Sequence, residues 1–184
     1  MKIGAMMAIL ATAGTVTQAK DGCTNQLPIM TVYLRFECGG MQVRQRAEGI
    51  ASEILGAAGV CVQWRTGWPK ANQEKHPILI EITSDTPEVV CQGALGCARA
   101  YEGVHIKVFW DRIQKTSGRE VAYALLAHVL AHEITHILEG VDQHSPEGVM
   151  KAHWTADDVL QMASKSLSFD PLDVKLIHDG LKRF

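Results

Sequence analysis

The sequence SGREVAYALLAHVLAHEITHILEG, residues 117–140, is the most informative stretch of this 184-residue chain. Apolar residues recur through it at helical spacing, and Gly140 is well suited to a left-handed helix C-cap. Ser117 can serve as the N-cap, with Glu120 three residues later as its capping-box partner. The pattern therefore predicts one long helix that runs from Ser117 to Glu139.

Within this helix, His132, Glu133 and His136 form the pattern H-E-x-x-H. Because an α-helix has 3.6 residues per turn, His132 and His136 project from the same face. Two imidazoles at this spacing can bind one Zn²⁺ at about 2.0–2.1 Å each. Glu133 is rotated by about 100° from His132. We therefore expect Glu133 to lie beside the metal and to act as the general base that takes a proton from a water activated there.

A catalytic zinc needs a third protein ligand and keeps its fourth position open. Gly140 lets the chain turn sharply away from the helix, and His144 follows four residues later. We expect His144 to be the third ligand, because it is near and imidazole suits zinc. The carboxylates of Asp142, Glu147 and Asp157 are the alternatives.

Two other side chains near the motif invite interpretation. His128 lies one turn before His132 on the same helical stripe, too far along the helix to share the metal, so we expect a buried or supporting histidine. Trp154 follows the loop after the helix, where it could form a wall of the cleft or part of the core. His76, His105, His153 and His178 carry no spacing signal of their own.

Upstream of the long helix, residues 29–36 and 60–64 read as strands with a helix over 41–58 between them. This β-α-β order predicts two parallel strands with a right-handed crossover. Further strands are expected at 78–82 and 104–110, a short edge strand at 97–101, and helices at 155–165 and from Asp170–Pro171 onward. The sequence therefore predicts a single α+β domain over residues 20–184.

The N-terminal segment has a different character. Residues 3–16 carry no charge, and Thr17-Gln18-Ala19 is a small-x-small ending. We expect residues 1–19 to be a secretory signal peptide, because 14 apolar residues fall short of the roughly 20 that a membrane span needs. The protein is then secreted or periplasmic, with no membrane span.

Export makes disulfides possible, and the chain has five cysteines. The odd number predicts one free thiol or an intermolecular bond. Cys91 and Cys97 are close enough in sequence to close a small loop.

The composition excludes several classes of protein. A hydrophobic fraction of 47% with 21% charged residues is normal for a globular domain. Lys and Arg number 18 and Asp and Glu 20, so the formal net charge is 18 − 20 = −2. With this charge and 6% aromatic residues, we expect no nucleic-acid partner. By default we expect a monomer.

The motif His132-Glu133-x-x-His136, followed by Gly140, His144-Ser145 and Gly148-Val149-Met150, resembles the metzincin clan of zinc endopeptidases, and its matrixin branch most. It is also similar to small exported bacterial zincin-like proteins. The gaps from His136 to Gly140 and from Gly140 to His144 are each one residue longer than the clan pattern.

The resemblance implies a twisted, mostly parallel sheet with an antiparallel edge strand, an active-site helix and C-terminal helices. It implies that Met150 lies beneath the metal in a tight Met-turn, which Gly148 helps to form. It also implies that an extended peptide pairs with an edge strand, which we place at Gly93, Ala94, Leu95 and Gly96.

These observations predict a secreted zinc-dependent endopeptidase that acts on a peptide or protein substrate. Two alternatives remain open. The first is a zinc-binding domain that binds a partner without peptidase activity. The second is a metal-dependent hydrolase of a non-peptide amide.

Overall fold

The computed structural model describes residues 29–70, 76–84, 91–98 and 104–183. The predicted signal peptide at residues 1–19, Cys23 and the last residues of the predicted edge strand, 99–101, lie outside these ranges.

Five strands form one sheet in the order β2-β1-β3-β5-β4. The strands are β1 Ile29–Phe36, β2 Cys61–Thr66, β3 Ile78–Thr83, β4 Gly96–Ala98 and β5 His105–Phe109. The pairs β1/β2, β1/β3 and β3/β5 are parallel, and β4 pairs antiparallel with β5 at the edge. Helix α1, Met41–Ala57, makes the predicted crossover between β1 and β2. The predicted α+β class, with its mostly parallel sheet and antiparallel edge strand, is confirmed.

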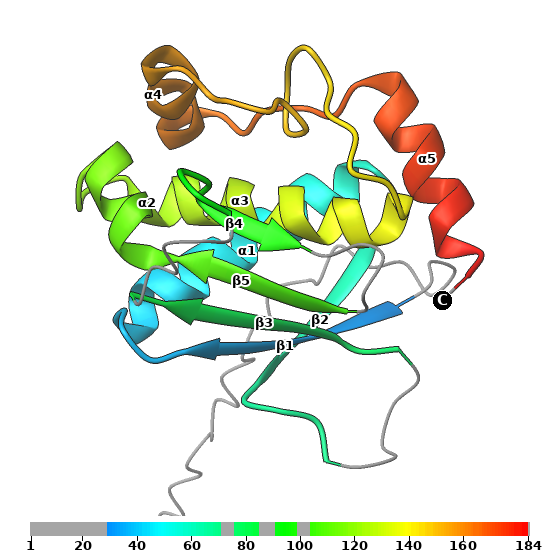
Figure 1. Ribbon diagram of the computed structural model, residues 1–184, viewed down its shortest axis with the longest axis horizontal. Helices are drawn as coiled ribbons and strands as arrows, with labels where there is room; N and C mark the ends of the chain where they lie inside the picture. The colour runs from blue at the N-terminus through cyan, green and yellow to red at the C-terminus, as the bar shows by residue number, and fades with distance from the viewer. Residues whose placement is uncertain (1–28, 71–75, 85–90, 99–103, 184) are drawn as a thin grey trace, which may run out of the picture.

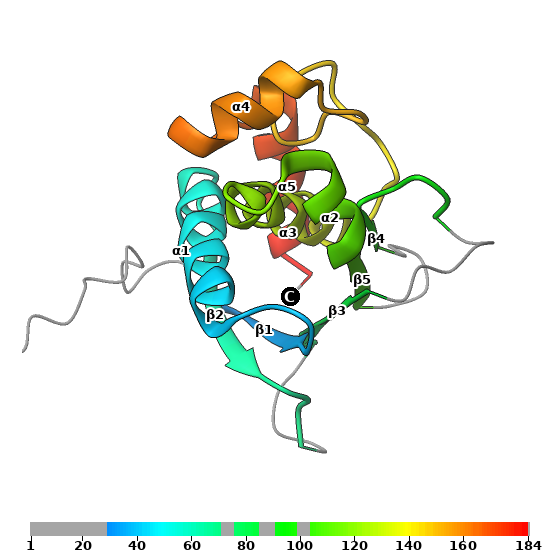
Figure 2. The same cartoon turned by 90° about the vertical axis from the view of Figure 1, so that its left-hand side faces the viewer.

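The helices gather on one face of the sheet (Figures 1 and 2). Buried and partly exposed residues alternate along β3, because successive side chains point to opposite faces of a strand. The inward side chains of Val32, Ile80 and Val108 are fully buried with those of α1 and of α3, Ala122–Glu139. The core therefore lies between the sheet and the two helices, and α3 is covered nearly all round.

Helix α3 begins later than predicted. Ser117 is the last residue of a separate helix, α2, Trp110–Ser117, and its hydroxyl donates to the Ile113 carbonyl at 2.9 Å. Gly118 follows with a φ of 76°, which breaks the helix, and the N-cap of α3 is Val121 without a side-chain bond. The predicted Ser117 cap is therefore wrong, whereas Gly140 ends α3 in the left-handed conformation as predicted.

Two shorter helices, α4 (Ala156–Ser164) and α5 (Pro171–Leu181), complete the chain. Each begins with a capping box, formed by Thr155 with Asp158 and by Asp170 with Asp173. Helix α4 lies on the side of α3 that faces away from the sheet, and α5 runs past the C-terminal end of α3 (Figure 1). Within the described residues, every helix is too short or too polar to cross a membrane.

Candidate metal centre

Three histidine side chains converge at the C-terminal half of α3. His132 and His136 come from successive turns of the helix, and His144 comes from the loop that follows it. One ring nitrogen from each lies within 4.8 Å of the other two. His132 and His136 are buried, whereas His144 is exposed, so the cluster is open to solvent on the side of the loop.

Main-chain carbonyls fix the orientation of two of these rings. The Nδ1 of His132 lies 2.8 Å from the Val149 carbonyl oxygen, and the Nδ1 of His136 lies 3.2 Å from that of Val141. Each Nδ1 therefore carries the proton and donates a hydrogen bond to the carbonyl oxygen. This leaves both Nε2 atoms unprotonated, with their lone pairs directed into the cluster.

The two Nε2 atoms lie only 3.0 Å apart. Two lone pairs at this distance repel each other unless a cation lies between them. Nitrogen ligands of one tetrahedral zinc, each at about 2.0–2.1 Å, would be about 3.3 Å apart. Burial, followed by the neighbouring His136, lowers the pKa of His132 to about 3, so the ring is neutral and ready to bind a metal at pH 7. The donor set therefore fits a metal ion.

The loop after α3 folds back against His132 through a tight turn. Gly148 has a φ of 79°, and a Cβ at this position would lie 2.2 Å from the Ser168 carbonyl oxygen, so only glycine fits. The Ser145 N–H donates to the Met150 carbonyl at 2.8 Å and closes the turn. Met150 itself is fully buried.

A side-chain bond from α5 also holds this loop. The Ser145 hydroxyl donates to Oδ1 of Asp173 at 2.6 Å, and the other oxygen of Asp173 accepts from the Asp170 N–H. Because Ser145 follows His144 directly, the bond anchors the part of the loop that carries the third histidine. Sequence reasoning missed this role of Asp173, for which the only local signal was helix capping.

Glu133 lies on α3 between the two histidines, with only 6% of its surface exposed. Its carboxyl group points towards β4, where it accepts a hydrogen bond from the main chain of Ala98. Burial raises the pKa of Glu133 to about 8. A cation bound by the histidine cluster would lower the pKa of Glu133 and favour its ionised form.

The solved structures of similar architecture include two archaemetzincins. The archaemetzincin of Methanopyrus kandleri gives a TM-score of 0.58 at 20% sequence identity, over 84% of this chain and 96% of that one. The archaemetzincin of Archaeoglobus fulgidus, complexed with malonate, gives a TM-score of 0.53 at 14% identity, over 80% of this chain and 100% of that one. No protein-family model and no curated protein matches the sequence.

The chain has the fold of the archaemetzincins. At these identities the likeness concerns the fold alone, and it confirms the predicted zincin-like architecture. The closer resemblance to matrixins stays a prediction.

The carboxylates considered as alternative ligands do not join the three histidines. Asp142, Glu147 and Asp157 are all exposed, and the group of side chains able to hold a metal among the described residues contains none of them. Trp154 lies beside the site, with its ring centroid 5.4 Å from that of His132.

His128 is a buried supporting residue. Its Nε2 accepts from the Leu167 N–H at 3.0 Å, so its Nδ1 carries the proton and donates to the Ala124 carbonyl at 2.7 Å. Both ring nitrogens are therefore occupied by the main chain. Burial lowers the pKa of His128, which keeps the ring neutral.

The short edge strand predicted at 97–101 begins at Gly96, but the segment predicted to pair with a peptide is only partly a strand. Gly93, Ala94 and Leu95 form a turn before β4, and only Gly96 of the four predicted residues belongs to the strand. The Leu95 carbonyl accepts from the Phe109 N–H at 2.9 Å. Since hydrogen-bonded and non-bonded pairs alternate along an antiparallel ladder, Leu95 and Cys97 face β5, and Gly96 and Ala98 face the open edge.

The turn is held in two ways. A disulfide joins Cys91 to Cys97, as the sequence suggested. The Arg112 guanidinium, on α2, donates to the carbonyls of Cys91 and Ala94. The turn that leads into β4 is therefore fixed to both β4 and α2.

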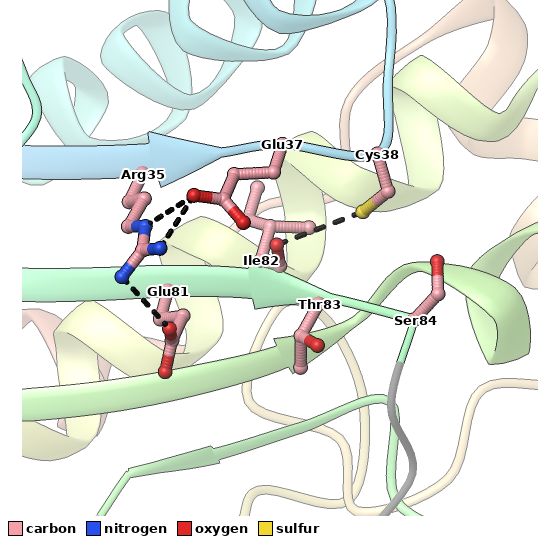
Figure 3. Close-up of a pocket in the computed structure, with 7 residues that line it drawn as sticks. All are labelled: Arg35, Glu37, Cys38, Glu81, Ile82, Thr83 and Ser84. Atoms are coloured by element: carbon pink, nitrogen blue, oxygen red, sulfur yellow. Dashed lines mark hydrogen bonds and ion pairs between the residues drawn. The ribbon is translucent and has the colours of Figure 1, made fainter.

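A hollow of about 150 Å³ lies at the carboxyl ends of β1 and β3, and no histidine is among the residues that line it (Figure 3). The Arg35 guanidinium within it donates to Glu37 at 2.7 Å and lies 3.6 Å from Glu81. The thiol of Cys38 is free and lies 3.6 Å from the Ile82 carbonyl oxygen. The charged groups are thus already paired with one another, and the hollow offers no unpaired charge to a ligand.

Proposed function

We propose that the protein is a zinc-dependent endopeptidase. The observation that carries this proposal is the cluster of His132, His136 and His144, with two lone pairs 3.0 Å apart and Glu133 on the same helix between its first two members. The three histidines would hold the metal and leave its remaining position open towards solvent.

A bound Zn²⁺ would supply Lewis acidity that polarises a carbonyl group and lowers the pKa of a water to about 7. The Glu133 carboxylate would take the proton from the attacking water. It would then deliver this proton to the nitrogen of the departing amine as the bond between the carbonyl carbon and this nitrogen breaks. Met150, fully buried in the turn that follows His144, would support the positions of the rings.

The substrate we propose is a peptide in extended conformation. Strand β4 lies at the edge of the sheet, next to α3, and the main-chain groups of Gly96 and the carbonyl of Ala98 face this edge, where a strand could add. Such binding uses the main chain and predicts weak sequence preference.

We also propose that the protein is exported. The proposal rests on the apolar segment and small-x-small ending of residues 1–19. The Cys91–Cys97 disulfide supports it, because structural disulfides persist in oxidising compartments.

The test compares the zinc-loaded wild type with Glu133→Gln on a mixture of unstructured peptides. We expect one zinc per chain in both proteins, and a loss of about 10²–10⁴-fold in peptide cleavage for the variant. Glu147→Gln, at an exposed position of the loop, is the matched control and should cleave like the wild type.

Cleavage by Glu133→Gln at the wild-type rate would refute the proposed chemistry. A wild type that binds zinc and cleaves no peptide would refute the peptidase. Hydrolysis of small acyl amides would then favour the amide hydrolase, and no hydrolysis of any kind would favour a zinc-binding domain.

A further inference from the structure

Gly96 is buried although it lies in an edge strand. A Cβ at this position would lie 2.6 Å from Oε1 of Glu133, 2.9 Å from its Cγ and 3.0 Å from its Cδ. The side chain of Glu133 thus lies directly on the α-carbon of Gly96. Even one methyl group at position 96 would force the carboxyl group to move.

The backbone conformation does not explain this glycine. The φ angle of Gly96 is not positive, so its backbone does not require glycine. Gly93, in the turn just before it, has a φ of 81°, and a Cβ at this position would meet nothing within 4 Å. Glycine is therefore needed at position 96 for the space it leaves, and at position 93 for the turn. The space at position 96 is filled by Glu133.

Ala98 completes the contact from the same side of the strand. Residues two apart in a strand share an orientation, and the pairing register turns the N–H groups of Gly96 and Ala98 towards the open edge. The Ala98 N–H donates to the Glu133 carboxyl group. The carboxyl group is therefore held by a steric contact at Gly96 and a hydrogen bond at Ala98.

We propose that Gly96 is a positioning residue for the general base. Its missing side chain lets the Glu133 carboxylate rest on β4, the strand that would bind the substrate. This inference rests on the proposed function, because it takes Glu133 as the base.

The first experiment measures kcat, KM and zinc content for Gly96→Ala. We expect kcat to fall about 10–100-fold, because a misplacement of about 1 Å costs a catalytic group up to about 10²-fold. KM should change less than about 3-fold, and one zinc per chain should remain. Gly49→Ala, on α1 with nothing within 4 Å of its Cβ, is the control and should match the wild type.

The second experiment separates positioning from a general structural defect. Glu133→Asp shortens the side chain by one methylene and withdraws it from position 96. In this background Gly96→Ala should cost less than about 3-fold in kcat, because the clash is gone. An equal loss in both backgrounds would contradict the inference.

The third readout needs no activity. In the zinc-free protein, the Ala98 amide should exchange with solvent at least about 10-fold faster in Gly96→Ala than in the wild type, because its acceptor has moved. Unchanged exchange would overturn the inference. Full activity of Gly96→Ala beside an inactive Glu133→Gln would refute this inference alone, whereas an active Glu133→Gln would refute the proposed function itself.

Discussion

At the C-terminal end of α3, Glu139 is 7% exposed, and its Oε1 is buried without a hydrogen-bond partner in the part of the chain that the structure describes. Burial, followed by the carboxylate of Asp173, raises the pKa of Glu139 to about 7. The folded protein therefore binds the proton of Glu139 more tightly than the unfolded chain does, whose pKa is near 4.5. This contribution to the free energy of unfolding is fully present below pH 4.5. This stabilisation is lost as the pH rises towards and through 7.

Replacement of Glu139 by Gln should therefore stabilise the protein increasingly between pH 5 and pH 8. We expect the free energy of unfolding of Glu139→Gln to exceed that of the wild type by about 1–3 kcal/mol at pH 8, with little difference at pH 5. Urea unfolding of the zinc-loaded proteins at both pH values measures this. Glu147→Gln, on the surface, is the control and should show no such dependence on pH. If Glu139→Gln also shows none, the prediction that Glu139 is protonated at pH 5 and ionised at pH 8 is contradicted.

The third ligand can be tested against its neighbours in the same loop. His144→Ala should weaken zinc binding more than about 100-fold, because loss of a ligand exceeds the 10–100-fold typical of supporting residues. Asp142→Ala and Glu147→Ala should change the Kd less than about 3-fold, since both side chains are exposed and outside the histidine cluster. Competition with a chromogenic chelator gives the three constants. A larger loss for either carboxylate variant would remove His144 from the site.

Among the secondary-structure elements, β4 is short and depends on covalent and main-chain support. Its middle residue, Cys97, is joined to Cys91, and Arg112 of α2 holds the intervening turn. Because the flanking residues Gly96 and Ala98 contact Glu133, the turn and the proposed base form one structural unit.

Removal of this disulfide should impair substrate binding without loss of zinc. In Cys91→Ser/Cys97→Ser we expect the free energy of unfolding to fall by about 2 kcal/mol and KM for a peptide to rise, because β4 is less ordered. Zinc content should stay at one per chain, since all three histidines lie elsewhere. Cys38→Ser, at the free thiol, is the control. A double variant with wild-type KM would show that the edge strand does not contribute to binding.

At the scale of the whole molecule, α3 is the element against which most others pack. It contacts α1, and α5 crosses its C-terminal end so closely that a Cβ at Gly180 would lie 1.7 Å from the Leu138 carbonyl oxygen. This close approach brings Asp173 to Ser145 and so links the last helix of the chain to the loop of the third histidine.

Gly180→Ala should therefore destabilise the protein although alanine favours helices. We expect the free energy of unfolding to fall by about 2–4 kcal/mol, because α5 must move away from α3. Gly56→Ala, on α1 in open space, should be neutral or slightly stabilising. Thermal unfolding of both variants measures the difference. Equal melting temperatures for wild type and Gly180→Ala would contradict the close packing.

The sequence predicted those features that depend on local spacing. His132 and His136 are about one helical turn apart with Glu133 between them, and the five strands and the helices other than α2 follow from hydrophobic periodicity. The break at Gly118 was missed because Ser117 and Glu120 match a capping box although the chain does not form one there. Such a motif is compatible with a cap and does not guarantee it.

The features that could not be predicted depend on contacts between distant segments. Ser145 and Asp173 are 28 residues apart, and neither residue type indicates the other. The need for glycine at position 96 is visible only when Glu133 of α3 is placed against β4. Burial of Glu139 likewise depends on α5, because the helix pattern alone does not show which face that helix covers.

The central claim, that three histidines hold one zinc, is tested most directly by anomalous diffraction at the zinc edge from crystals of the zinc-loaded protein. We predict one peak, about 2.0–2.1 Å from Nε2 of His132, Nε2 of His136 and a ring nitrogen of His144. No peak among these rings, or a peak bound by Asp142 or Glu147 in place of His144, would contradict the account.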